Sequence, residues 1–329
     1  MTEQPLVLSV IVPAYNEAPC LPHLVEEIGR VAAGLGCSYE IVIVNDGSSD
    51  GTEACLAGLA SDYPEVKPIN FSRNFGKEAA LAAGLESAKG ECLAFMDADL
   101  QHPPDLLGAM YAQWRNGKDV VNAVKRHRGN ESGPYRWFAQ AFNRLMSGMI
   151  GSDMSGASDY KLIDRQVAEV LLDCPERNRF FRGLVAWVGF NVGTVAFDVQ
   201  ERELGESKWS LWGLMRYSAT NIVSFSSWPL RAVGIAGFIT AALGVVLLLQ
   251  TLVRYAMGEA ASGFTTVIAV QILLSGMLLT ALGVISIYLS QIYEEQKQRP
   301  IFIIKRPRPP RPGPGDAFER VLHARESVQ

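Results

Sequence analysis

Short apolar runs alternate with amphipathic stretches through the first part of the chain. Runs rich in Val and Ile occupy 6–12, 40–44, 66–71, 91–96 and 119–124. Between them, apolar positions recur at helical spacing in 21–33, 52–61, 77–89 and 104–116. Short strands that alternate with helices are typical of an α/β domain with a mostly parallel sheet. We therefore predict this fold class for the N-terminal part of the protein.

Two long stretches near the C-terminus contain no charged residue. They run over 232–253 and 260–293. Each is longer than the roughly 20 apolar residues that a membrane-spanning helix needs. A buried helical hairpin of a soluble protein is the alternative, but core helices rarely extend this far without a charge. We predict two transmembrane helices, at 232–253 and 265–290, within a membrane part that covers residues 231–293.

The segment before the first apolar stretch differs in composition from the α/β domain. Residues 209–230 contain many large apolar side chains and few charges, including Trp209, Trp212 and Trp228. Tryptophan favours the boundary between membrane and water, so we interpret 209–230 as an amphipathic interfacial helix. A helix packed into the soluble domain is the alternative. The expected soluble domain then covers residues 1–208, and a basic, Pro-rich tail covers 294–329.

The charge pattern predicts an orientation in the membrane. The N-terminus has no basic segment followed by a long apolar run, so we expect no secretory signal and a cytoplasmic first domain. The tail after the second apolar stretch is rich in Lys and Arg, which agrees with the positive-inside rule. Arg254, in the short loop between the two stretches, is a mild exception.

Charge and cysteine content argue against nucleic-acid binding and against a metal site built from Cys and His. The formal net charge is −4, so no basic excess over the whole chain indicates a nucleic-acid partner. The 5 cysteines are far apart in the sequence, without a C-x-x-C pair, and no histidine stands at metal-ligand spacing. We therefore expect reduced thiols and no nucleic acid.

Acidic residues follow three of the predicted strands directly. The first strand leads into Glu17, the second into Asp46, and the fourth into Asp97 and Asp99. Open α/β sheets bind ligands beyond the carboxyl ends of their strands, so acids at neighbouring ends indicate a site. Asp97 and Asp99 have the D-x-D spacing, and paired carboxylates suit Mg²⁺ or Mn²⁺ held together with substrate phosphates. A capping pair at a strand end would have the same spacing.

Six motifs resemble, in order, those of one known family. They are VPAYNE at 12–17, VNDGSSDGT at 44–52, FSRNFGKEAALAAGL at 71–85, DADLQHPP at 97–104, SDYKLIDR at 158–165 and RELGESKWS at 202–210. The chain thus resembles the inverting glycosyltransferases of GT-A fold in glycosyltransferase family 2. Within them it is most similar to the polyprenyl-phosphate glycosyltransferases, which include dolichol-phosphate mannose synthases and bactoprenol glucosyltransferases. The apolar C-terminal part, ending in IYEEQKQRPIFII, is most similar to the bactoprenol branch, whose members are bacterial and often tetrameric. The resemblance implies a homo-oligomer in a bacterial inner membrane.

The resemblance also implies a donor site. The residues that match those holding the nucleotide-sugar are Pro13, Tyr15, Glu17, Asp46, Asp97 and Gln101. Asp46 would face the uracil base. Asp97 and Asp99 match the residues that bind the divalent metal and the diphosphate, and which of the two dominates stays open.

Further matches concern the acceptor and the reaction. Asp159 matches a carboxylate proposed as catalytic base, Arg202 and Lys208 match cations near the diphosphate, and Arg126 and Arg136 match cations that hold the lipid phosphate. For each cation the alternative is a solvated surface charge. A phosphate monoester has a second pKa near 6 and is largely a dianion at pH 7, hence a competent nucleophile by itself. Asp159 is therefore a candidate for orienting the reactants as well as for deprotonation. Similarly, residues 73–77 match a donor contact, with a simple strand-to-helix turn as the alternative.

These features together predict an enzyme. It would transfer a sugar from a UDP-sugar to a polyprenyl phosphate, with inversion and release of UDP. Glucose and undecaprenyl phosphate rest on the branch resemblance, and UDP-N-acetylglucosamine, GDP-mannose or an aminoarabinose donor stay open. A processive polysaccharide synthase is disfavoured because the chain has no Q-x-x-R-W motif after the D-x-D pair. A non-enzymatic flippase or scaffold with a degenerate domain is disfavoured because Asp97, Asp99 and Asp159 are all present.

Overall fold

The computed structural model describes residues 6–125, 147–148, 157–174, 176–177, 179–197, 227–258 and 263–306. Several predicted features lie outside these ranges. They are the four cations Arg126, Arg136, Arg202 and Lys208, most of the expected interfacial helix, and the tail beyond residue 306.

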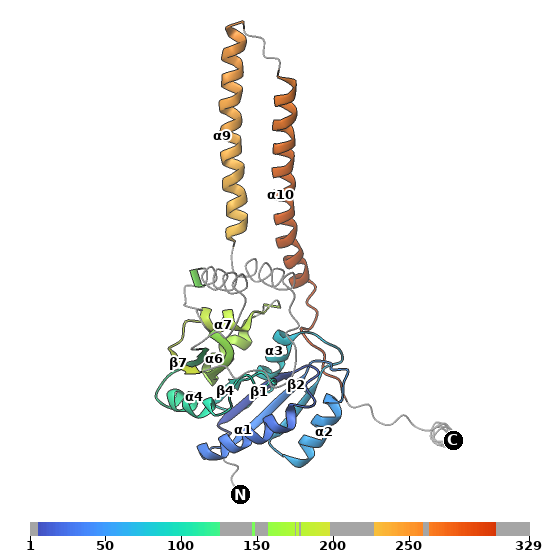
Figure 1. Cartoon of the computed structure of the whole chain (residues 1–329), viewed down its shortest axis with the longest axis vertical. Helices are drawn as coiled ribbons and strands as arrows, with labels where there is room; N and C mark the ends of the chain where they lie inside the picture. Colours follow the sequence, from blue (N-terminus) through green and yellow to red (C-terminus); the bar gives the residue numbers. More distant parts are fainter. Residues whose placement is uncertain are drawn as a thin grey trace, which may run out of the picture.

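A seven-stranded sheet forms the centre of the N-terminal domain (Figure 1). The strands lie in the order β3-β2-β1-β4-β6-β5-β7. Their bounds are β1 Leu8–Ala14, β2 Tyr39–Asn45, β3 Val66–Asn70, β4 Cys92–Phe95, β5 Val120–Lys125, β6 Ala157–Asp164 and β7 Val192–Phe197. All neighbouring pairs are parallel except those of β6, which runs antiparallel to both β4 and β5. The predicted α/β fold with a mostly parallel sheet is confirmed.

Helices cover both faces of this sheet. Their bounds are α1 Leu21–Leu35, α2 Thr52–Asp62, α3 Lys77–Ser87, α4 Leu106–Arg115, α6 Arg165–Asp173 and α7 Phe181–Trp187. Alternate residues of β1 face opposite cores: Val10 and Val12 pack with α1 and α4, whereas Ile11 packs with the Ala-rich α3. A strand covered on both faces needs apolar residues on both, which is why residues 10–12 of β1 and 41–44 of β2 are continuous apolar runs.

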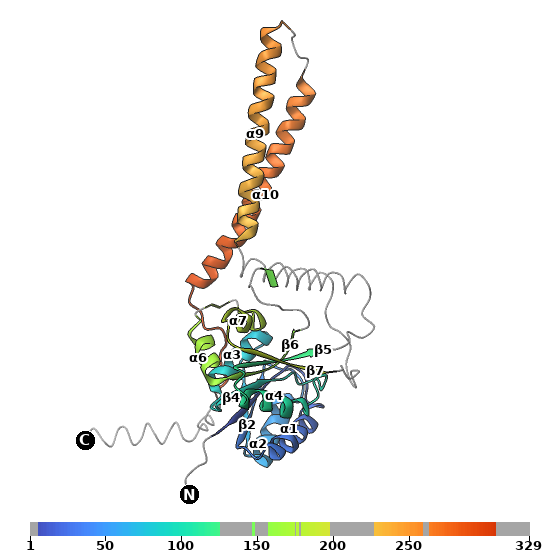
Figure 2. The ribbon, with the colours of Figure 1, turned by 90° about the vertical axis from the view of Figure 1, so that its left-hand side faces the viewer.

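Two long helices follow the domain, α9 at Trp228–Ala256 and α10 at Phe264–Gln296. They project away from the sheet (Figure 2). Their apolar side chains are exposed, and both are long and apolar enough to cross a membrane, with mean hydropathies of 2.5 and 2.2 over the best windows. Residues 228–230, expected at the end of the interfacial helix, belong to α9. The second predicted span, 265–290, lies within α10, which continues beyond it to Gln296.

After α10 the chain returns to the edge of the sheet. We call residues 297–306 the return segment. Its backbone joins the end of β3 through a bridge between Phe71 and Ile304 and through hydrogen bonds from Ser72 N–H to Ile303 O (2.9 Å) and from Lys305 N–H to Asn70 O (2.7 Å). An edge strand otherwise exposes unpaired N–H and C=O groups, and the return segment covers part of this edge.

Side chains reinforce this attachment. The Phe302 ring stacks on that of Phe71, with centroids 5.2 Å apart and planes 10° apart. Phe71 belongs to the core beneath α3, so Phe302 extends that core outward. The Lys305 ammonium contacts both carboxylate oxygens of Glu53, at 2.7 and 2.8 Å, in an exposed pair that adds little stability. The attachment is therefore mainly apolar and backbone in character.

The loop after β2 touches the loop that connects β3 to α3, at the carboxyl edge of the sheet. Gly47, just after β2, has a φ of +66°, and a Cβ placed there would lie 2.2 Å from the backbone carbonyl carbon of Arg73. A side chain cannot fit in that space, and the left-handed backbone favours glycine. The close approach fixes residues 73–76 against the end of β2.

Substitution of Gly47 by alanine should therefore destabilise the domain. The clash with the backbone and the left-handed φ together should cost about 2–5 kcal/mol. Gly58→Ala is the matched control, because Gly58 lies exposed within α2 and nothing stands within 4 Å of its added Cβ. That change should stabilise by about 0.5–1 kcal/mol. Urea unfolding of the detergent-solubilised variants measures both values, and equal stabilities would contradict the packing described for Gly47.

Removal of the Phe302 ring should loosen the return segment. Phe302→Ala should lower the free energy of unfolding by about 1–3 kcal/mol, because a partly buried ring leaves the core. Ile303→Ala removes a side chain that is 51% exposed and keeps the backbone hydrogen bond, so it should cost less than about 1 kcal/mol. The same unfolding measurement compares the two. A larger effect of Ile303→Ala would show that the stacked ring contributes little.

Candidate active site

The antiparallel strand β6 brings a distant acid to the D-x-D pair. Phe95 of β4 pairs with Lys161 of β6, and the same register, continued by two residues, sets Asp97 opposite Asp159. Because β6 runs antiparallel, its beginning lies at the edge where the parallel strands β1, β2 and β4 end. The structure thus gathers Asp97, Asp99 and Asp159 at one corner of the sheet.

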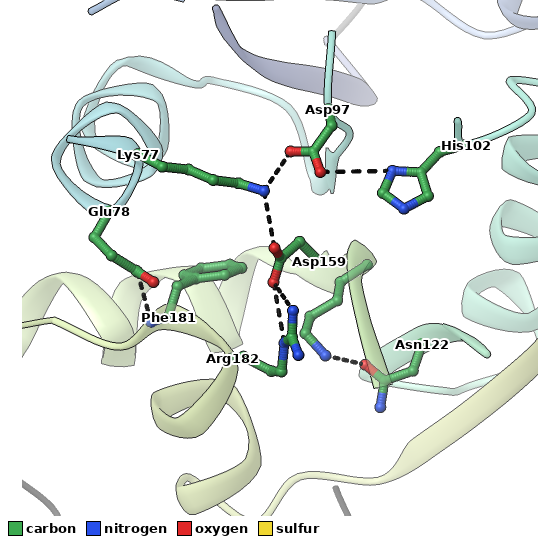
Figure 3. Close-up of polar contacts among 9 residues, drawn as sticks. Lys77, Glu78, Asp97, His102, Asn122, Asp159, Phe181 and Arg182 are labelled. Atoms are coloured by element: carbon green, nitrogen blue, oxygen red, sulfur yellow. Dashed lines mark hydrogen bonds and ion pairs between the residues drawn. The ribbon is translucent and has the colours of Figure 1, made fainter. Parts of the chain in front are cut away.

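The Lys77 ammonium lies between two of these carboxylates (Figure 3). Its Nζ is 2.5 Å from Asp97 Oδ1 and 2.8 Å from Asp159 Oδ2. Lys77 is the first residue of α3, where a cation is disfavoured by the helix dipole. The two carboxylates compensate for that position. In the sequence, Lys77 enters only through the match of residues 73–77 to a donor contact, and its two acidic partners could not be predicted there.

Arg182 of α7 approaches Asp159 from the other side. Its Nε and one terminal nitrogen both donate to Asp159 Oδ1, at 3.0 and 2.7 Å. Burial opposes ionisation of Asp159, but the charges of Arg182 and Lys77 outweigh it and hold its pKa well below the usual value. A carboxylate with so low a pKa is a weak proton acceptor near pH 7. This environment favours an orienting role for Asp159.

Glu78 fixes the position of α7 and therefore of Arg182. Its Oε2 accepts the N–H of Phe181, the first residue of α7, at 2.8 Å. Burial raises the pKa of Glu78 to about 7, and the hydrogen bond from Phe181 opposes that shift. Two adjacent residues of α3 thus support Asp159. Lys77 contacts it directly, and Glu78 positions its other partner, Arg182, through α7.

The D-x-D loop has a strained backbone. Leu100 has a φ of +58°, which is uncommon for a residue other than glycine and concentrates at functional sites. Asp99 Oδ1 accepts the N–H of Gln101 at 3.2 Å, and Asp97 Oδ2 lies 3.9 Å from His102 Nδ1. Both carboxylates are half-buried, so they face the solvent-accessible side of the corner.

The donor set here fits a divalent cation bound together with a diphosphate. Within the described ranges, no three or more His, Cys, Asp or Glu side chains form a ready-made metal cluster. Mg²⁺ and similar ions, however, are commonly bound through one or two carboxylates plus substrate phosphates. The ammonium held between Asp97 and Asp159 shows that this corner accommodates positive charge.

The VPAYNE loop is tied to the loop after β2. Asn16, at a φ of +57°, donates its N–H to Ser48 Oγ and accepts the N–H of Ser49 on Oδ1, both at 2.9 Å. Glu17 donates its N–H to Thr52 Oγ1 at 3.2 Å. Pro13 is half-buried near the end of β1, just before the buried Ala14, and Tyr15 is 41% exposed. The expected nucleotide residues therefore share one face with the D-x-D corner.

Asp46 has a structural task besides its expected contact with the nucleotide. Its two carboxylate oxygens accept the N–H groups of Phe75 and Gly76, at 2.7 and 2.9 Å. Burial raises its pKa, and these two hydrogen bonds oppose the shift. Asp46 therefore holds the turn that leads directly into Lys77. Its expected contact with uracil stays a prediction.

Comparison with known proteins supports a family assignment. The family described as Glycosyl transferase family 2 matches residues 9–185. A glycosyltransferase from Synechocystis sp. is 37% identical over 302 residues, which are 90% of this chain and 94% of that one. A prophage bactoprenol glucosyl transferase homolog from Escherichia coli is 33% identical over 307 residues, which are 91% and 98% of the two chains.

Among solved structures, similarity extends to a glucosyl-3-phosphoglycerate synthase from Mycobacterium tuberculosis in complex with Mn²⁺, UDP-glucose and phosphoglyceric acid. The TM-score is 0.48 at 17% identity, and the match covers 67% of this chain and 78% of that chain.

The matched residues 9–185 contain the sheet corner with Asp97, Asp99 and Asp159, together with Lys77 and Arg182. The predicted enzyme class and the GT-A type of α/β fold are therefore confirmed. The protein is a glycosyltransferase, and its chain belongs to glycosyl transferase family 2.

Proposed function

We propose that this protein transfers a sugar from a UDP-sugar to a polyprenyl phosphate at a membrane surface. The observation that carries the proposal is the extent of the match to bactoprenol glucosyl transferases. A match covering 91% of this chain and 98% of the E. coli homolog must include both α9 and α10. The similarity thus extends beyond the catalytic domain to the part that would meet a lipid.

The arrangement of the long helices supports a membrane location. Arg231 lies at the start of α9, and Lys297 and Arg299 follow the end of α10. Both of these helix ends face the catalytic domain (Figure 1). By the positive-inside rule, these charges support a catalytic domain on the cytoplasmic side. We propose a bacterial inner membrane, as the resemblance to the bactoprenol branch implies. We also propose a homo-oligomer, which the same resemblance implies.

The chemistry proposed for the site needs little proton transfer. An oxygen of the lipid phosphate attacks the anomeric carbon, the bond from that carbon to the diphosphate breaks, and UDP leaves with inversion. The phosphate monoester is largely a dianion at pH 7, so it needs no base of its own. With its low pKa, Asp159 would instead orient Lys77 and Arg182, which present positive charge to two anionic substrates.

The other expected residues take complementary parts in this proposal. Asp97 and Asp99 would hold Mg²⁺ or Mn²⁺, which when bound neutralises charge that develops on the leaving diphosphate. Gln101 would lie near the same diphosphate, and Pro13, Tyr15, Glu17 and Asp46 would hold the nucleoside. We propose that Arg202 and Lys208 contact the diphosphate and that Arg126 and Arg136 contact the lipid phosphate. Glucose is the proposed sugar, because the E. coli relative is a bactoprenol glucosyl transferase homolog.

Transfer of radiolabelled sugar to undecaprenyl phosphate tests the proposal. Purified protein in detergent would be assayed with UDP-glucose, UDP-N-acetylglucosamine and GDP-mannose, each with Mg²⁺, Mn²⁺ or EDTA. We expect label in the lipid from UDP-glucose, dependent on the metal. Label from another donor would correct the sugar. No label in the lipid from any donor, in folded protein, would contradict the proposed acceptor.

Asp159→Asn should abolish transfer and leave UDP binding nearly intact. The change removes the charge that holds Lys77 and Arg182, and we expect kcat to fall by at least about 100-fold. Asp62→Asn is the matched control, because Asp62 is an exposed residue at the end of α2 and should leave the rate unchanged. Initial rates and UDP titrations by calorimetry provide the measurement. A variant with full activity would disprove a role for Asp159 in the reaction.

A further inference from the structure

The Lys77 ammonium contacts an oxygen of one of the two candidate metal-binding carboxylates. Its 2.5 Å contact is to Oδ1 of Asp97, one of the two carboxylates suited to the metal. The second contact is to Asp159 of β6, the strand that pairs with β4. A single cation on a flexible side chain therefore links the acids of β4 and β6.

The backbone of Lys77 is fixed, but its ammonium is able to move. Asp46 holds the N–H groups of Phe75 and Gly76, directly before Lys77. The side chain of Lys77 is 41% exposed, and that of Asp97 is 26% exposed. Lysine is a compact charge at the end of four methylenes, so a shift of its head needs no rearrangement of α3.

Electrostatics makes the metal and the ammonium compete for Asp97. A dication on Asp97 and a monocation on the same carboxylate repel each other strongly at this range, and the partial burial weakens solvent screening. A diphosphate changes the balance, because its oxygens accept both a metal and an ammonium. Donor and metal would then enter together, whereas metal alone would meet repulsion.

We propose that Lys77 is a positioning residue that makes metal binding depend on the nucleotide diphosphate. In this proposal, which rests on the proposed function, the ammonium links Asp97 to Asp159 before the donor binds. It then moves from Asp97 to the donor diphosphate as the metal reaches Asp97. Arg182 differs, because the two hydrogen bonds from its guanidinium go to Asp159 Oδ1, whereas Lys77 also contacts Asp97. The two cations around Asp159 thus have separate tasks.

Titration of Mn²⁺ in the absence of nucleotide, followed by the electron paramagnetic resonance signal of free Mn²⁺, tests the proposal without measuring turnover. Lys77→Met should bind Mn²⁺ alone at least about tenfold more tightly than wild type, because the competing charge is gone. With saturating UDP, wild-type affinity should rise far more than that of Lys77→Met. Lys77→Arg keeps the charge and should retain weak binding of Mn²⁺ alone.

Two control variants make the result specific. Lys118→Met removes one charge elsewhere, since Lys118 contacts Asn191, and should leave Mn²⁺ affinity unchanged. Arg182→Met should loosen Asp159 with a much smaller effect on Mn²⁺ alone than Lys77→Met. Unchanged or weaker binding of Mn²⁺ alone by folded Lys77→Met would overturn the proposal, as would equally tight wild-type binding with and without UDP. The sugar-transfer assay is independent of these outcomes, so failure of either proposal can be told from failure of the other.

Discussion

The pairing of β4 with β6 creates the central constraint on this active site. It brings Asp97, two residues beyond the end of β4, close to Asp159 of β6, and two neighbouring carboxylates repel each other. The fold compensates with two cations, Lys77 from α3 and Arg182 from α7. Much of the surrounding structure can be understood as support for those cations. The same charge balance suits a reaction in which two anionic substrates must approach each other.

Residues that do not touch Asp97 or Asp159 also help to position Lys77 and Arg182. Asp46, at the end of β2, holds the turn before α3, and the absence of a side chain at Gly47 lets that turn approach β2 closely. Glu78 holds the start of α7 and so positions Arg182. The return segment packs on Phe71, a few residues before the same turn. Elements from distant parts of the chain thus converge on the start of α3.

Sequence periodicity predicted β1 to β5 and α1 to α4 within a few residues, because each is a local pattern of apolar positions. Asp97 and Asp99 were found in the same way, from their place at the end of a strand. The antiparallel direction of β6 could not be predicted, since it depends on partners far away in the chain. Lys77 was read within a possible turn motif, and Arg182 has no local pattern at all. Only the fold shows that both cations meet Asp159. A lysine at the first position of a predicted helix was the one local signal available.

The return segment also has a consequence for how the protein is made. Residue 304 emerges from the ribosome after α9 and α10 have been synthesised, so the edge of β3 near Phe71 has no partner from this segment until then. The β3 edge is therefore covered only after both apolar helices have been synthesised. During this interval the exposed strand edge is a potential site for aggregation. Protection of this strand edge is thus linked to completion of the two apolar helices.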